Sequence, residues 1–175
     1  MNTRVRALCV TALFTTLLAI GAWITIPVGI PPYTMQSFML YCVLWLLPFR
    51  RSFSAIALYL LMGAIGLPVF AGFQGGFGVL LGPTSGYLFG FLLMPLVMRA
   101  AKPTPASRTL FCALGTLVCY IFGTAWYVIA YGECSTAGIA AATMQCVLPF
   151  LLPDAVKLVL AAAVCKRLEP RIKNL

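Results

Sequence analysis

Apolar runs alternate with short polar connections along the entire chain. A helix that crosses the apolar core of a bilayer needs about 20 residues, and most of the runs approach or exceed that length. We expect Pro27 to end the first helix, and Pro149 and Pro153 to bend the last one. The pattern predicts an all-α membrane protein with six transmembrane helices, formed by residues 5–26, 35–49, 53–70, 83–98, 109–130 and 138–168.

The connection at residues 71–82, AGFQGGFGVLLG, is rich in glycine. It lacks the GxxxxGK[ST] and GxGxxG spacings of phosphate-binding loops, so it does not predict a nucleotide site. Its flexible backbone, together with Phe73 and Gln74, suits a flap over a ligand. A plain extracellular turn fits the same residues equally well.

The composition agrees with a lipid environment. Hydrophobic residues make up 62% of the chain and charged residues 9%, whereas about a quarter of a typical soluble domain is charged. The length of 175 residues suggests one domain, residues 1–175. The first apolar run is long enough to span and has no obvious small-residue cleavage site, so we predict no cleaved signal peptide.

The positive residues mark the orientation in the membrane. The chain has twelve Lys and Arg but only three Asp and Glu. The basic residues stand in small groups between apolar runs and form no solvated basic face, so no nucleic-acid partner is expected. If the N-terminus is cytoplasmic, eleven of the twelve lie on that side and only Lys157 lies inside the membrane. The positive-inside rule therefore predicts a multi-pass protein of the cell membrane with both termini in the cytoplasm.

Cysteine usage gives no sign of metal chemistry. The seven cysteines form no CxxC pair, and the chain has no histidine, so neither a metal site nor a cofactor is predicted. Most of the cysteines are interpreted as small apolar packing residues. Cys134, in a predicted loop, is the possible exception.

Two opposite charges stand inside the last apolar run. In PDAVKLVL, Asp154 precedes Lys157 by three residues, so both lie on one face of a helix. The spacing to Lys166 places them in the outer half of the bilayer. A charge that faces lipid costs several kcal/mol, so the pair is expected to face the bundle interior or a watery cavity. A structural ion pair and a ligand site are both consistent with this, and we favour the ligand site.

Small residues recur at helical spacing in two places. Gly82, Gly86 and Gly90 share one face of the fourth predicted helix, where a backbone or a ligand can approach closely. We interpret Gly90 as a packing residue and Gly86, nearer the outside, as a site candidate. On the first helix, Ala12 and Thr16 form a small-xxx-small pattern that suits packing within the bundle or against another subunit.

Several segments together resemble the BioY family. They are ALFTTLLAIGAWITIPV, PPYTMQSF, LYLLMGAIGLPVFAG, GGFGVLLGPTSGYLFGF and PDAVKLVLA, in the order seen in that family. BioY proteins are the biotin-specific substrate-binding (S) components of energy-coupling-factor (ECF) transporters. The resemblance implies the six-helix S-component fold, biotin as ligand, and a transmembrane T subunit and two ATPase subunits as partners.

The resemblance also implies roles for individual residues. The acidic residue and the lysine on the family's last helix match Asp154 and Lys157. The family's GPTxGY motif contains Gly86 and Tyr87, and its docking motif on the first helix maps to Ala12 and Thr16. Two positions depart from the common pattern: Ser85 stands where many members have glycine, and Thr16 stands where alanine is frequent.

The chemistry of biotin fits these residues. Asp154 can accept a hydrogen bond from a ureido N–H, and Lys157 can donate to the ligand's carbonyl or carboxylate. Further polar contacts are expected from Gln36 and Gln74. The apolar ring and chain of the ligand are expected to lie against aromatic side chains, namely Trp23, Tyr33, Phe73 and Tyr87.

Two other function classes remain open. A stand-alone carrier for biotin would use Asp154 as a proton-linked group. An intramembrane enzyme ranks last, because the sequence offers no convincing nucleophile–base set or pair of carboxylates.

Overall fold

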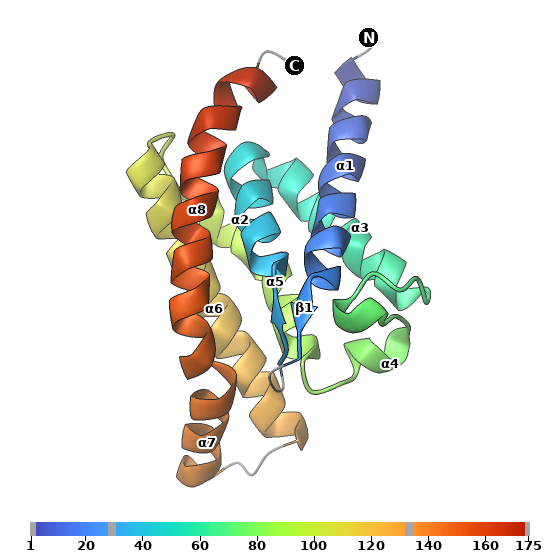
Figure 1. Ribbon diagram of the computed structural model, residues 1–175, viewed down its shortest axis with the longest axis vertical. Coiled ribbons are helices and arrows are strands. Elements are labelled where there is room, and N and C mark those ends of the chain that lie inside the picture. Colours follow the sequence, from blue (N-terminus) through green and yellow to red (C-terminus); the bar gives the residue numbers. More distant parts are fainter. Residues whose placement is uncertain (1–2, 28–30, 132–134, 174–175) are drawn as a thin grey trace.

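The computed structural model describes residues 3–27, 31–131 and 135–173. Glu133 and Cys134, which the sequence places in a loop, lie outside these ranges. The described chain is almost entirely helical (Figure 1), which confirms the predicted all-α class. Its helices are α1 (Thr3–Trp23), α2 (Gln36–Leu46), α3 (Phe49–Ala64), α4 (Phe77–Leu80), α5 (Ser85–Met98), α6 (Pro105–Tyr131), α7 (Thr136–Cys146) and α8 (Leu148–Lys173).

Two short extended segments join α1 to α2. Strands β1 (Thr25–Ile26) and β2 (Tyr33–Thr34) pair antiparallel, with Thr25 opposite Thr34. The glycine-rich connection at residues 71–82 is not a featureless loop, since it contains the 3-10 turn η1 (Ala71–Phe73) and the short helix α4.

Three described segments are long and apolar enough to cross a membrane: Arg4–Trp23, Pro105–Ala130 and Thr136–Pro170. Two shorter apolar helices, α2 and α5, accompany them. Figure 1 shows that α2 occupies only part of the long axis and that the β1–β2 pair continues from its N-terminal end. The number of complete spans stays a prediction.

The last apolar run divides where proline interferes. We expected one bent helix over 138–168, but α7 ends at Cys146 and α8 begins at Leu148. Pro149 has no N–H to donate to the carbonyl four residues earlier, so a helix running unbroken into it would lack a bond. Near the start of α8, that missing N–H is harmless. Helix α8 then continues through Pro153.

Helix α2 forms the centre of the core. It packs against α1 and α8, and also contacts α3, α5 and α6. Its residues 40–45 are all buried, as expected for a helix enclosed by others. The outer helices α1, α6 and α8 instead expose many large apolar side chains, which suits a lipid-facing surface.

Candidate functional site

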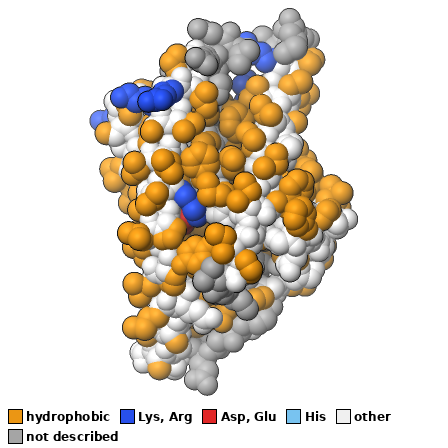
Figure 2. All heavy atoms as spheres, viewed as in Figure 1, with side chains coloured by type: hydrophobic (Ala, Val, Ile, Leu, Met, Phe, Trp, Pro, Cys, Tyr) orange, Lys and Arg blue, Asp and Glu red, His pale blue; other side chains and the backbone are white. Residues whose placement is uncertain are grey.

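Asp154 and Lys157 lie together at the wall of a cavity of about 820 Å³. Lys157 Nζ is 3.0 Å from Asp154 Oδ1, and only 12% and 11% of the two side chains are exposed. Figure 2 shows positive charge gathered at one end of the molecule, and a further patch of opposite charges midway along it among hydrophobic side chains. The pair therefore faces the bundle interior and a cavity, as its cost in lipid requires.

Each charge has several partners besides the other. Asp154 Oδ1 accepts from Ser37 Oγ at 2.8 Å, and its Oδ2 accepts from Tyr120 Oη at 2.6 Å. Lys157 Nζ donates to the Thr34 carbonyl at 2.8 Å and to Ser37 Oγ at 3.1 Å. The network thus joins β2, the first turn of α2, the middle of α6 and α8. Two parts of the chain distant from α8 in sequence, residues 34–37 and Tyr120, thus hold the pair in place.

The hydrogen bonds of Asp154 and Lys157 determine which groups of a ligand each residue can bind. Lys157 has three N–H donors, and all three are used by Asp154, Ser37 and Thr34. Asp154 has about four lone-pair positions and accepts three hydrogen bonds. A ligand donor can therefore add to Asp154 directly, whereas a ligand acceptor must replace one of the acceptors around Lys157.

Three further predicted site residues line the same cavity: Gln36, Gln74 and Tyr87. Gln36 is buried and donates from Nε2 to Tyr59 Oη at 2.8 Å, so its amide is held in place. The Tyr87 hydroxyl lies 3.0 Å from Thr124 Oγ1. The rest of the wall is largely apolar and includes Leu40, Phe70, Val79, Leu88, Phe91 and Phe150. A mostly apolar pocket with a few fixed polar groups is typical of small-molecule sites.

Three predicted aromatic contacts do not line the cavity. Trp23 stacks on Phe73 with ring centroids 5.2 Å apart and donates from Nε1 to the Pro68 carbonyl at 2.7 Å. These contacts tie the end of α1 to the loop that follows α3. Tyr33 stacks on Phe150, with centroids 4.5 Å apart. The three residues therefore support elements around the cavity.

The hydroxyl of Tyr33 replaces a backbone N–H donor that a proline lacks. It donates to the Pro149 carbonyl at 2.8 Å. In a regular helix that carbonyl would accept from the N–H of residue 153, but Pro153 has none. Tyr33 thus fixes β2 to the first turn of α8.

Gly86 does not line the cavity either, although its neighbour Tyr87 does. A Cβ there would overlap the side chain of Trp126 on α6, much as one at Gly90 would crowd Cys119. Both glycines therefore let α5 and α6 approach closely, and the structure gives Gly86 the packing role that we expected only of Gly90. The neighbouring Ser85 is fully buried and donates from Oγ to the Gly82 carbonyl at 2.6 Å.

A tight loop, rather than a long flap, borders the cavity between α3 and α4. Gly76 N donates to the Gly63 carbonyl at 2.7 Å, and Phe70 N donates to the Gln74 carbonyl at 2.9 Å. A Cβ at Gly75 would overlap the carbonyl oxygen of Leu67. Gly75 is therefore required by a close backbone approach.

This close approach allows a matched test with two cavity-lining glycines. Gly75→Ala is expected to lower the free energy of unfolding by about 1–3 kcal/mol, because backbone must move to admit the methyl group. Gly78→Ala is expected to change it by less than about 1 kcal/mol, since nothing lies within 4 Å of a Cβ there. Thermal unfolding of both variants in detergent measures the difference. Equal stabilities would show that the loop has no such constraint.

Ala12 and Thr16 lie on the outer surface of α1. Both are exposed, and Thr16 Oγ1 donates to the Ala12 carbonyl at 3.0 Å. The hydroxyl is thus turned back onto its own helix, leaving a surface of small groups. Neither residue lines the cavity.

Cysteine and acidic side chains in the described part of the chain do not gather into a possible metal site. No group of three or more His, Cys, Asp or Glu comes together there. Five of the six described cysteines are buried: Cys42, Cys112, Cys119, Cys146 and Cys165. Their burial agrees with the packing role expected from the sequence.

Comparison with known proteins gives consistent matches. Residues 1–174 match the BioY family. "Biotin transporter BioY" from Thermotoga maritima is 37% identical over 170 residues, which cover 94% of this chain and 96% of that protein. "Probable biotin transporter BioY" from Pyrococcus horikoshii is 35% identical over 158 residues, which cover 90% and 93%.

A solved structure has the same fold. The crystal structure of the S-component for biotin from an ECF-type ABC transporter matches with a TM-score of 0.82. The match covers 97% of this chain and 93% of that one, at 23% sequence identity. The architecture expected from the sequence resemblance is therefore confirmed at the level of the fold.

Proposed function

We propose that this chain, which belongs to the BioY family, is a membrane-embedded biotin-binding component that serves biotin uptake. The observation that carries the proposal is the buried Asp154–Lys157 pair beside a largely apolar cavity. At about 820 Å³, the cavity falls within the range of about 300–1,000 Å³ typical of small-molecule pockets. The names of the relatives supply the identity of the ligand.

The ligand has groups that match this wall. Biotin carries two ureido N–H donors, a carbonyl, an apolar ring and a carboxylate. We propose that one ureido N–H donates to the remaining lone-pair position of the Asp154 carboxylate. Lys157 then donates to either the carbonyl or the carboxylate of biotin. The described side chains of Gln36, Gln74 and Tyr87 supply further polar contacts along the cavity. Four other predicted residues have an indirect role, because they hold together the helices and loops that shape the cavity: Gly86, Trp23, Tyr33 and Phe73.

Direct binding to the purified chain tests this function. Biotin is titrated into the detergent-solubilised protein, and mass spectrometry identifies any small molecule that co-purifies. We expect saturable binding of one biotin per chain, and much weaker binding of an analogue with methylated ureido nitrogens, because that analogue cannot donate to Asp154. A chain that binds neither compound would overturn the proposal.

The proposed topology follows from charge and from the arrangement of the helices. We propose one domain, residues 1–175, with six spans in the cell membrane and both termini in the cytoplasm. The start of α1 and the end of α8 lie at the same end of the molecule (Figure 1), and Lys and Arg gather at that end (Figure 2). The positive-inside rule assigns such an end to the cytoplasm.

We further propose that an ECF module of one T subunit and two ATPase subunits energises uptake, with the chain itself performing no enzymatic step. Ala12 and Thr16 offer a docking surface, because both are exposed small residues one turn apart on α1. Neither residue lines the cavity, so the proposed docking surface and the ligand site use different residues.

The docking surface can be tested with leucine substitutions. Ala12→Leu and Thr16→Leu are each expected to leave biotin binding unchanged and to lower ATP-driven uptake at least fivefold, because the larger side chains prevent close helix contact. Uptake is measured in liposomes that contain the chain and its module. Ala141→Leu, at an exposed position on α7, is the control. Normal uptake by both α1 variants would contradict the assignment.

A stand-alone carrier is the second candidate. The buried carboxylate of Asp154 beside the cavity is the kind of group that couples transport to protons in membrane proteins. Liposomes that contain this chain alone, with a proton gradient and no ATPase, distinguish the two. Robust biotin uptake there would favour the carrier.

A further inference from the structure

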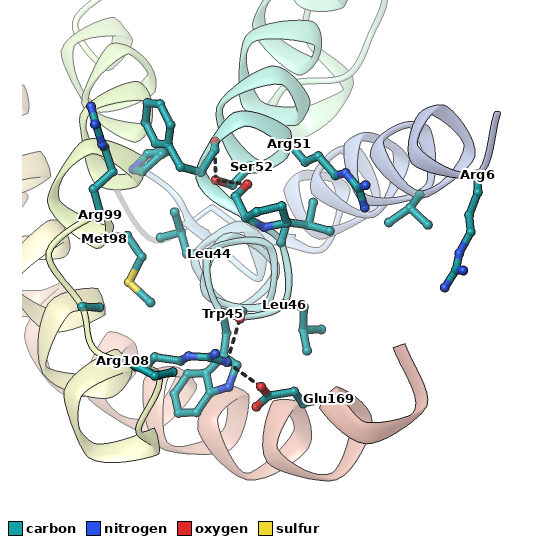
Figure 3. A pocket seen from close by; sticks show the side chains of 17 residues that line it. Arg6, Leu44, Trp45, Leu46, Arg51, Ser52, Met98, Arg99, Arg108 and Glu169 are labelled. Atoms are coloured by element: carbon teal, nitrogen blue, oxygen red, sulfur yellow. Dashed lines mark hydrogen bonds and ion pairs between the residues drawn. The ribbon is translucent and has the colours of Figure 1, made fainter. Parts of the chain in front are cut away.

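A second cavity of about 800 Å³ lies at the opposite end of α2 from Ser37. Residues 44–48, where α2 turns into α3, form one side of it, and Figure 3 looks onto it along α2. It is separate from the cavity that contains the Asp154–Lys157 pair. This second cavity is called the basic pocket below.

Four arginines from different segments line the basic pocket: Arg6 from α1, Arg51 from α3, Arg99 just after α5 and Arg108 from α6. The lining contains one carboxylate, that of Glu169 on α8. Among the described residues, the lining therefore carries three more positive than negative charges.

Two of these arginines interact with neighbouring side chains in the structure. Arg108 Nη1 lies 3.1 Å from Glu169 Oε1 and 3.2 Å from the Trp45 carbonyl oxygen, to which it donates. The Arg99 guanidinium lies over the Phe49 ring, 4.9 Å from its centroid. Figure 3 shows these two on one side of α2, away from α1.

Arg6 and Arg51 are different. Within residues 3–27, 31–131 and 135–173, neither forms an ion pair with a carboxylate. Figure 3 places both on the α1 side of α2, and both line the basic pocket. A guanidinium presents a planar set of N–H donors that matches a phosphate group, so such a pair suits a phosphate in particular.

Apart from Ser52, the remaining wall of the basic pocket is largely apolar. It includes Val10, Leu46, Leu47, Pro48 and Met98. Trp45, also in the lining, has a buried indole N–H without a hydrogen-bond partner in the described part of the chain, although buried donors normally have one. A lining that combines guanidinium groups with hydrocarbon matches an amphiphile better than a small soluble anion.

We propose that the basic pocket binds the headgroup of an anionic phospholipid, with Arg6 and Arg51 holding the phosphate. The pocket lies at the end of the helices where positive residues gather, which is where a lipid headgroup is expected in the proposed topology. Basic pockets between transmembrane helices on this side are known to take anionic headgroups. A bound lipid would join α1 to α3 at the membrane surface.

The test compares lipids and matched arginine variants. The purified chain is titrated with phosphatidylglycerol, phosphatidylcholine and inorganic phosphate, and bound lipid is measured by native mass spectrometry. We expect phosphatidylglycerol to bind at least tenfold more tightly than phosphatidylcholine, and Arg6→Gln and Arg51→Gln each to weaken it about fivefold. Arg50→Gln removes the same charge from the neighbouring position, outside the pocket lining, and is expected to leave binding unchanged.

Three results would overturn the proposal. Equal binding of the two lipids would show that the headgroup charge is not recognised. An equal loss in Arg50→Gln would show that only general surface charge attracts the lipid. Displacement of phosphatidylglycerol by millimolar inorganic phosphate would assign the pocket to a soluble anion. Biotin binding, measured on the same samples, is expected to be the same in all variants, so a failure of the biotin assignment remains distinguishable.

Discussion

Asp154→Asn and Lys157→Ala are each expected to weaken biotin binding at least tenfold, which corresponds to about 1.4 kcal/mol. The asparagine amide places an N–H₂ group among the donors of Ser37, Tyr120 and Lys157, all of which now point at the carboxylate. It therefore offers a ligand N–H a weaker acceptor, without negative charge. The alanine removes the cation that we assign to the ligand's carbonyl or carboxylate.

Titration of biotin into the purified variants measures both effects. Glu169→Gln makes the same carboxylate-to-amide change at a residue outside the cavity, and is expected to keep wild-type affinity. Thermal unfolding of each variant shows whether the protein remains folded. If Asp154→Asn and Lys157→Ala both bound biotin as tightly as the wild type, the pair would have only a structural role.

The second large effect concerns stability. Lys157→Met is expected to lower the free energy of unfolding by about 3–5 kcal/mol, because it leaves the Asp154 carboxylate buried without its counter-charge. In the double variant Asp154→Leu/Lys157→Met, neither charge remains. Since an apolar pair of similar volume often replaces a buried ion pair at little cost, the double variant is expected to recover most of the loss.

Denaturant titration in detergent measures this recovery, while biotin titration measures function in the same variants. The double variant is expected to be nearly as stable as the wild type and yet unable to bind biotin tightly. That combination would mean that the two charges are present for the ligand. A double variant as unstable as Lys157→Met, or one that still binds biotin, would contradict the expectation.

The Asp154–Lys157 pair was predictable because charge is rare in this chain. Only three acidic residues occur in 175, so an acid one helical turn from a lysine inside an apolar run is conspicuous. Their partners were not predictable in the same way. Tyr120 lies in the middle of an apolar run, and Ser37 is one hydroxyl among many. The Thr34 group that contacts Lys157 is a backbone carbonyl, which any residue type would offer.

The aromatic residues show a different limit of sequence reasoning. Trp23, Tyr33 and Phe73 stand near the predicted connections, which made them reasonable walls for a ligand. In the structure, Trp23 and Phe73 stack on each other and Tyr33 stacks on Phe150. Aromatic pairs gain stability from such contacts, and residue type alone does not distinguish a ring that meets a ligand from one that meets another ring.

The glycines show a similar ambiguity. A face of small residues predicts a close approach, but the sequence does not say whether a ligand or a helix makes it. At Gly86 and Gly90 the approaching partner is α6. The partner depends on how the helices are placed around the core, which is a property of the whole fold and not of the local pattern.

The bond from Lys157 to the Thr34 carbonyl has a consequence for how the protein can report its occupancy. Thr34 belongs to the β1–β2 pair, which follows α1 directly, and α1 carries Ala12 and Thr16 on its outer surface. A cargo molecule that accepts this hydrogen bond from Lys157 in place of Thr34 would loosen the strand pair from α8, leaving the bond from Tyr33 to the Pro149 carbonyl. The loaded and unloaded forms would then differ at the base of α1, so that a partner resting on that helix could sense the cargo without touching it.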